Sequence, residues 1–221
     1  MSINLKKGLF FLCLCLAGLS CLAIDFDRLQ GAITQKFGVN SLSNFNAWKG
    51  MMVTANKLDI DEKLKRVNEF FNRRVGWGED LSVWGISDYW ATPMDTLGKG
   101  EGDCEDFAIA KYFTLINLGV PLESLRLVYV KIKANVLDND NVAQAHMVLA
   151  YYKTADSDPL ILDNQITEIT PASRRKDLTP IFSFNSEGYY LTLNGARESM
   201  NHANWSRWQD LLKRAMKEGF N

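Results

Sequence analysis

Hydrophobic residues recur at helical spacing in the first part of the chain. Between residues 25 and 74, the apolar positions that fit one helical face include Leu64, Val67, Phe70 and Phe71. Residues 103–118 predict a second helix, because Asp103 is a good N-cap and a glycine and a proline follow the segment. Apolar residues cover most of its circumference, so we expect this helix to be central and buried. The Gly- and Trp-rich stretch 76–102 predicts loops and short turns packed over it.

The second half of the chain changes to the pattern of strands. Apolar segments predict strands at residues 125–132, 146–152, 160–163 and 188–193. The polar run 154–159 is a turn signal that joins the second and third strands into a hairpin. Helical spacing then returns in a closing amphipathic helix, at Trp205, Trp208, Leu211, Leu212 and Met216. Helices followed by antiparallel strands indicate an α+β fold.

The first 23 residues have the pattern of an export signal. Lys6 and Lys7 precede an uncharged apolar run of 12 residues, 8–19, and small residues follow up to Ala23. Twelve residues are short for a membrane span, so a retained transmembrane helix is the weaker interpretation. We expect cleavage after Ala23, export to the periplasm, and one domain over residues 24–221; lipidation at Cys21 is the alternative.

Composition narrows the classes of function. The chain has 221 residues, of which 47% are hydrophobic and 23% charged, as in globular proteins. Its 25 basic and 26 acidic residues leave no positive excess, which disfavours broad nucleic-acid binding. Of 4 cysteines, only Cys104 lies beyond the expected signal, so the mature domain has no internal disulfide.

Cys104 is placed where a helix favours a thiolate. It follows the expected N-cap, and the free N–H groups and the helix dipole at this end stabilise negative charge on sulfur. The same N–H groups could hold the oxyanion of a tetrahedral intermediate. The alternative is a cysteine that packs as a small hydrophobic residue.

The predicted hairpin supplies partners for this thiol. Opposite residues of an antiparallel pair have a constant index sum, and a sum of about 309, from a turn centred at 154–155, places His146 opposite Asp163. Each residue alone has an ordinary structural interpretation. Together with a cysteine at a helix N-terminus, they predict a Cys-His-Asp arrangement for nucleophilic catalysis.

The motifs around these residues resemble those of the bacterial transglutaminase-like cysteine proteinases, and among them the periplasmic adhesin proteases. The matching runs are W-A-T-P at 90–93, G-D-C-E-D-F-A-I-A-K-Y at 102–112, A-H-M-V-L at 145–149 and L-D-N at 162–164. The resemblance implies a papain-like fold, with Cys104 as nucleophile, His146 as general base and Asp163 as orienting acid. The loop 133–145 is longer than is usual in the family, which affects the expected shape of the substrate cleft.

Asp103, Glu105 and Asp106 surround the thiol with negative charge and oppose its ionisation. A hard cation with oxygen ligands would offset that charge. The resemblance implies calcium dependence, with Asp103 and Glu105 as ligands, whereas N-capping alone would need no metal. An EF-hand at 138–149 is excluded, because Ala143 and Leu149 stand where the loop needs Gly and Glu.

The resemblance also implies a biological role. It points to a calcium-dependent endopeptidase that cuts the N-terminal region of a large surface adhesin, which releases the adhesin and disperses biofilm. The implied partner is an inner-membrane receptor that senses cyclic di-GMP and sequesters the protease. Two alternatives stay open: a transglutaminase or amidase with the same triad, and a non-catalytic, calcium-stabilised exported binding module.

Overall fold

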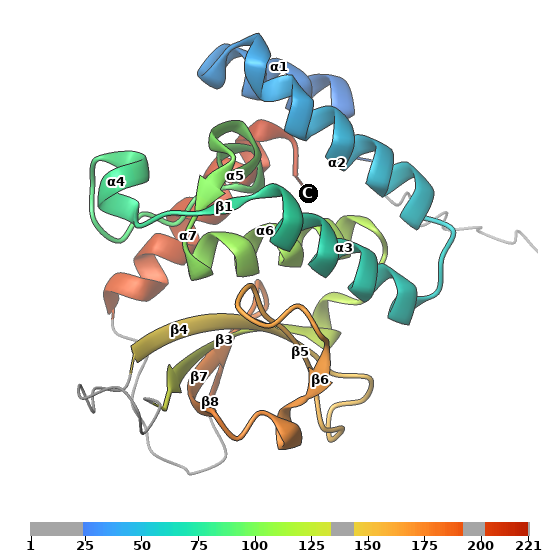
Figure 1. Ribbon diagram of the computed structural model, residues 1–221, viewed down its shortest axis with the longest axis vertical. Coiled ribbons are helices and arrows are strands. Elements are labelled where there is room, and N and C mark those ends of the chain that lie inside the picture. The colour runs from blue at the N-terminus through green and yellow to red at the C-terminus, as the bar shows by residue number, and fades with distance from the viewer. Residues whose placement is uncertain (1–23, 134–143, 192–201, 221) are drawn as a thin grey trace, which may run out of the picture.

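Helices form one layer of the molecule and an antiparallel sheet forms the other, as Figure 1 shows for the computed structural model. The structure describes residues 24–133, 144–191 and 202–220, so the expected signal at 1–23 lies outside it. The helices are α1 (Phe26–Phe37), α2 (Leu42–Ala55), α3 (Ile60–Arg74), α4 (Asp80–Trp84), α5 (Pro93–Lys99), α6 (Cys104–Asn117) and α7 (His202–Glu218). Three short 3-10 turns are η1 (Val39–Ser41), η2 (Leu122–Ser124) and η3 (Ala172–Arg174). The predicted α+β class is confirmed.

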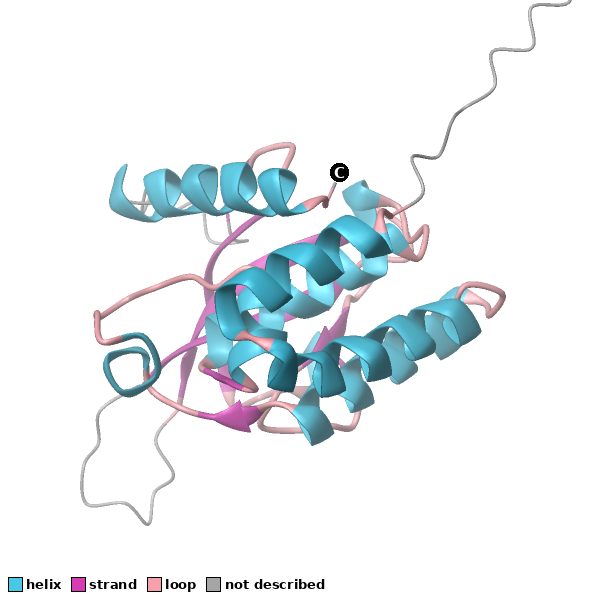
Figure 2. Cartoon of the chain, turned by 90° about the horizontal axis from the view of Figure 1, so that it is seen from above, coloured by secondary structure: helices cyan, strands magenta, loops and turns pink. Residues whose placement is uncertain are grey.

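Six strands form the sheet in the order β6-β5-β4-β3-β7-β8, with every neighbouring pair antiparallel. They are β3 (Leu125–Ile132), β4 (Gln144–Tyr151), β5 (Leu160–Leu162), β6 (Thr170–Pro171), β7 (Leu178–Phe184) and β8 (Tyr189–Leu191). All four predicted strands are present; the end of the fourth, at 192–193, lies outside the described residues. Seen from above, the helices cover the sheet (Figure 2).

The hairpin of β4 and β5 has a different register from the predicted one. Tyr151 pairs with Leu160 and Leu149 with Leu162, which gives an index sum of 311 rather than 309. The turn is centred between residues 155 and 156 rather than 154 and 155, and the Tyr152 N–H, 2.7 Å from the Ser124 carbonyl, continues the pairing of β4 with β3. Asp163 is therefore diagonal to His146 rather than opposite it. A shift of two residues preserves the face of the sheet, so both side chains still share one face.

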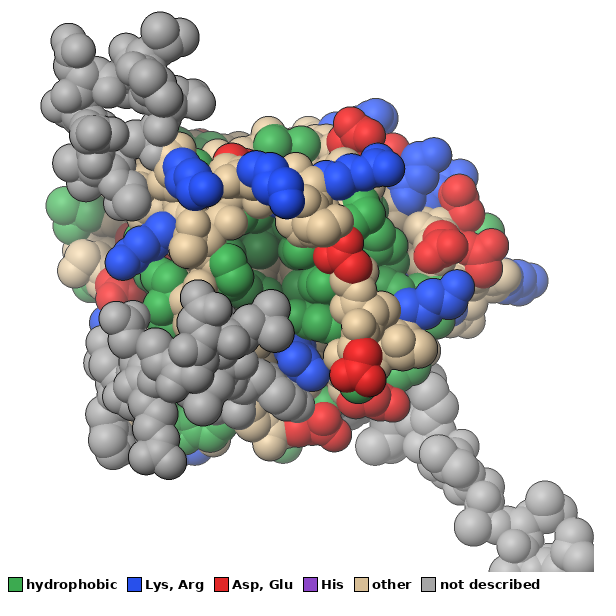
Figure 3. All heavy atoms as spheres, turned by 90° about the horizontal axis from the view of Figure 1, so that it is seen from below, with side chains coloured by type: hydrophobic (Ala, Val, Ile, Leu, Met, Phe, Trp, Pro, Cys, Tyr) green, Lys and Arg blue, Asp and Glu red, His purple; other side chains and the backbone are tan. Residues whose placement is uncertain are grey.

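The central helix α6 is buried as predicted, from Asp106 to Leu115. It packs between α3 and the sheet, and Met147 and Leu149 of β4 face it in the main core. A second apolar cluster lies on the other face of the sheet and consists of Val128, Val130, Val148, Ala150 and Ile161. Figure 3, from the sheet side, shows a hollow lined by hydrophobic side chains and bordered by Lys and Arg. Within the described residues, no helix combines the length and the apolar character that crossing a membrane requires.

Two local predictions need correction. The stretch 76–102 is not only loop: it contains α4 and α5 and two short parallel strands, β1 (Gly76–Trp77) and β2 (Glu101–Gly102). Helix α5 forms because the Thr92 hydroxyl caps it and Pro93 fits its first turn. In α7, Met216 was predicted on the apolar face but is 64% exposed. Ala215 lies in the core instead, as Leu211 does.

A polar network holds α7 against α5 and the segment before it. Arg214 donates to the Trp90 carbonyl at 2.7 Å and to the Tyr89 hydroxyl at 3.0 Å. The Thr92 hydroxyl donates to Oε1 of Glu218 at 2.9 Å, whereas Oε2 is buried and accepts no hydrogen bond in the described chain. Burial raises the pKa of Glu218 to about 7, and the charge of Asp95 adds to this rise.

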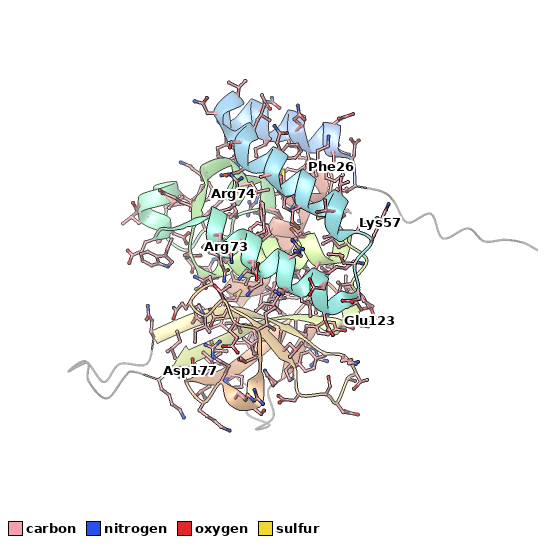
Figure 4. The ribbon with its side chains drawn as sticks, turned by 45° about the vertical axis from the view of Figure 1, so that its right-hand side comes forward. Phe26, Lys57, Arg73, Arg74, Glu123 and Asp177 are labelled. Atoms are coloured by element: carbon pink, nitrogen blue, oxygen red, sulfur yellow. The ribbon has the colours of Figure 1, made fainter. Side chains whose placement is uncertain are left out.

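We expect Glu218→Gln to flatten the pH dependence of stability. Because the folded-state pKa of Glu218 lies above its ordinary value of 4.5, the protonated side chain favours folding fully below pH 4.5. That contribution, about 2 kcal/mol, is lost as the pH rises through 7. Urea unfolding at pH 5 and pH 8 measures it, with Glu123→Gln, at an exposed residue (Figure 4), as the control. An equal fall in the free energy of unfolding from pH 5 to pH 8 in both variants would contradict the raised pKa of Glu218.

Candidate functional site

His146 and Asp163 form a buried hydrogen-bonded pair. Nε2 of His146 lies 2.9 Å from Oδ1 of Asp163, and the two side chains are 2% and 0% exposed. His146 enters from the start of β4, and Asp163 follows the last residue of β5. Because the carboxylate occupies Nε2, Nδ1 is the ring nitrogen left to exchange a proton with a nucleophile.

The carboxylate of Asp163 is charged in this setting. Burial alone would raise its pKa, but hydrogen bonds from His146, the Gln165 N–H and Arg175 outweigh burial and bring the pKa down to about 2. The Gln165 N–H donates to Oδ1 at 2.9 Å. The pair can therefore orient the imidazole and stabilise it when it gains a proton.

Cys104 is the first residue of α6, directly after the N-cap Asp103. Oδ1 of Asp103 accepts from the Asp106 N–H, which fixes the start of the helix as the sequence predicts. The thiol is free and half-buried beside β4. The backbone N–H of Met147, the residue after His146, is directed at the sulfur and favours its ionised form. The structure thus places the thiol next to the strand that carries His146.

The thiol donates to Glu105 rather than to the imidazole. The distance from Sγ to Oε2 of Glu105 is 2.7 Å, and within the described chain no hydrogen bond joins Sγ to His146. Burial raises the pKa of Cys104, and the charges of Glu105 and Asp103 raise it further. In this arrangement the sulfur stays protonated, which agrees with the expectation that these acids oppose ionisation of the thiol.

Four carboxylates gather around the start of α6. One oxygen from each of Asp80, Asp103 and Asp106 lies within 4.8 Å of the others, and Asp103 forms a second such group with Cys104 and Glu105. Asp80 comes from α4 and is the member that sequence analysis missed. No local pattern distinguishes it from an ordinary first-turn acid of a short helix.

Close approach of these acids disfavours their charged forms. Burial and neighbouring charges raise the pKa of Asp80 to about 6, of Asp106 to about 8 and of Asp103 to about 9. Oδ1 of Asp80 and Oδ2 of Asp106 are buried without a hydrogen-bond donor in the described chain. Converging oxygens that lack donors fit a hard divalent cation.

Sequence analysis also missed two polar contacts to Asp163. Asn72 of α3 donates to its backbone carbonyl at 2.7 Å, and Arg175 donates to Oδ2 at 2.8 Å. Asn72 is one of several polar residues on an amphipathic helix, and Arg175 stands in a charged run typical of an exposed turn. Both contacts depend on tertiary structure, so the residue pattern carried no signal for them.

Comparison with known proteins bears on this geometry. Residues 43–177 match a family described as bacterial transglutaminase-like cysteine proteinase. The solved structure of Legionella pneumophila LapG is 37% identical, with a TM-score of 0.70 and coverage of 87% of this chain and 98% of that chain. Its EGTA-treated form is 37% identical, with a TM-score of 0.72 and coverage of 87% of this chain and 98% of that chain. Its calcium-bound form is 38% identical, with a TM-score of 0.69 and coverage of 86% of this chain and 99% of that chain. A search of curated proteins gives no match.

Proposed function

The chain belongs to the bacterial transglutaminase-like cysteine proteinases, and from that premise we propose that Cys104, His146 and Asp163 are its catalytic triad. Nδ1 of His146 takes the thiol proton as Sγ attacks the peptide carbonyl. The imidazolium then protonates the departing amine, which leaves a thioester on Cys104. Water attacks the thioester with the imidazole as base, and the carboxylic acid product and the thiol are released.

The observation that carries this proposal is the buried bond between His146 and Asp163. A histidine that needed only a structural partner could bond either nitrogen to any acceptor. Here Nε2 is bonded, and the next residue along β4, Met147, directs its N–H at Cys104, the only free cysteine of the described chain. That combination supports a general base on the strand beside the thiol.

We further propose that the enzyme binds Ca²⁺ at the acids around the start of α6. LapG has been solved in a calcium-bound form, and this chain presents matching chemistry in Asp103, Glu105, Asp80 and Asp106. When bound, the cation supplies positive charge beside the nucleophile. Asp103 and Glu105 would hold the cation, and its charge would weaken their hold on the thiol proton.

The substrate, location and control of the enzyme are also proposals. The motifs at 90–93, 102–112, 145–149 and 162–164 support cleavage of the N-terminal region of a large surface adhesin. The signal-like residues 1–23 support a periplasmic location. Release of the adhesin would disperse biofilm, and a cyclic di-GMP-sensing receptor in the inner membrane would sequester the enzyme.

Incubation with an N-terminal adhesin fragment tests this function. We expect the wild-type protein with Ca²⁺ to cut the fragment into two pieces whose masses sum to the substrate plus one water. Cys104→Ala should leave the fragment intact, because it lacks the nucleophile. A crosslinked product, lighter than the sum of its two components by one ammonia, would instead identify a transglutaminase.

A further inference from the structure

Arg175 holds the oxygen of Asp163 that His146 leaves free. The guanidinium Nη2 donates to Oδ2 of Asp163 at 2.8 Å, while Oδ1 faces His146. We propose that Arg175 is a positioning residue of the triad, whose guanidinium fixes the plane of the Asp163 carboxylate and through it the ring of His146. This inference rests on the proposed protease function.

The arginine is itself rigidly placed. Its side chain is 7% exposed, and it forms a fork with Asp177, from Nε to Oδ1 at 3.0 Å and from Nη2 to Oδ2 at 2.7 Å. Asp177 lies on the sheet layer at the surface end of this fork (Figure 4). A planar guanidinium bonded at two points cannot rotate freely, so the direction of its third bond, to Asp163, is set.

The backbone of Arg175 is also tied down. Its N–H donates to the Ala172 carbonyl at 3.0 Å, and its own carbonyl accepts from the Leu178 N–H at 3.1 Å, at the start of β7. On the opposite side, Asn72 of α3 holds the main chain of Asp163 at 2.7 Å. Asp163 is thus fixed at its backbone by the helix layer and at its carboxylate by the turn before β7.

Charge gives Arg175 a second effect. A buried carboxylate facing a neutral imidazole needs a permanent positive partner, and an arginine supplies one. The other charged groups that act on Asp163 here are Lys111 of α6, which is buried, and Asp177. Burial lowers the pKa of Lys111 to about 7, so near neutral pH it is a less dependable cation than Arg175.

The rate of Cys104 alkylation by iodoacetamide tests the inference without any adhesin. In calcium-containing buffer we expect Arg175→Gln to react about 10–100-fold more slowly than wild type, since the imidazole is misplaced. Arg175→Lys keeps the charge but not the fork, so we expect a partial rescue of the rate.

Arg174→Gln is the matched control, because it removes the same charge from the exposed neighbouring residue. A wild-type rate in Arg175→Gln would overturn the inference, and so would an Arg175→Lys variant that is as slow as Arg175→Gln. If Arg175→Gln does not fold, a wild-type rate in Arg175→Lys overturns it. A slow wild-type reaction with the profile of a free thiol would instead refute the proposed function itself.

Discussion

We expect His146→Ala to cleave the adhesin fragment with a kcat/KM about 10³–10⁴-fold below that of the wild-type protein. The substitution removes the base that ionises the Cys104 thiol and the acid that protonates the leaving amine. The loss should be large here because Glu105, the present hydrogen-bond partner of the thiol, raises the pKa of the sulfur instead of favouring its ionised form. Initial rates with Ca²⁺ present measure the effect.

Gln144→Ala is the matched control for this substitution. Gln144 lies two residues earlier on β4, on the same face of the strand, and is exposed. We expect its rate to stay within about twofold of wild type. Cleavage by His146→Ala within tenfold of the wild-type rate would refute the triad. A binding module with an inert cysteine would show no cleavage by either protein.

The second large effect is that of calcium removal. In excess EGTA we expect the proteolytic activity to disappear and Tm to fall by about 5–10 °C at pH 8, the loss that corresponds to a ligand at about 100 times its Kd. Without a cation, Asp80, Asp103 and Asp106 must share one buried region with mutual repulsion. Thermal unfolding and cleavage assays in EGTA and in CaCl₂ measure the two losses.

The pH dependence of this effect has a definite sign. The pKa values of Asp80, Asp106 and Asp103 are raised to about 6, 8 and 9, above the ordinary 3.8. In EGTA, the contribution of these three acids to stability should therefore be greatest below pH 4 and fall as the pH rises through these values. Calcium favours the charged acids, so the Tm difference between CaCl₂ and EGTA should be larger at pH 8 than at pH 5.5.

Two N-cap aspartates separate cation binding from simple capping. Asp103 caps α6 and Asp59 caps α3, and each side chain accepts a backbone N–H three residues on. Asp103→Asn should abolish the response of Tm to calcium, whereas Asp59→Asn should keep it. Equal responses of Tm to calcium in the two variants would contradict calcium binding at these acids. Identical thermal unfolding curves of the wild-type protein in CaCl₂ and EGTA would contradict it too.

The local parts of the fold were predictable from residue pattern. The N-cap Asp103 and the apolar circumference of the following helix are short-range features, and α6 begins and is buried as expected. The sharing of a face by His146 and Asp163 was also predictable, because strand alternation depends only on parity. The register was wrong by two residues because the turn is centred one residue further along the chain than its polar run suggests, and no pattern in the turn fixes that centre.

The parts that could not be predicted are long-range contacts of polar side chains. Asp80 joins the acid cluster only because α4 folds against the start of α6, and Arg175 reaches Asp163 only through the turn before β7. The sequence allows the thiol of Cys104 to donate a hydrogen bond to either Glu105 or His146. The structure shows that Glu105 is the acceptor. Side-chain choice among nearby partners is set by geometry rather than by residue type.

The site is divided between the two layers of the molecule. Cys104 and the acids belong to the helices, whereas His146, Asp163 and Arg175 belong to the sheet. Each half is internally bonded, and within the described residues the hydrogen bond that links the sulfur to the strand comes from the backbone N–H of Met147. A small displacement between the layers would therefore switch catalysis off while leaving both halves intact. An inhibitor that binds between the two layers would therefore need no resemblance to the substrate.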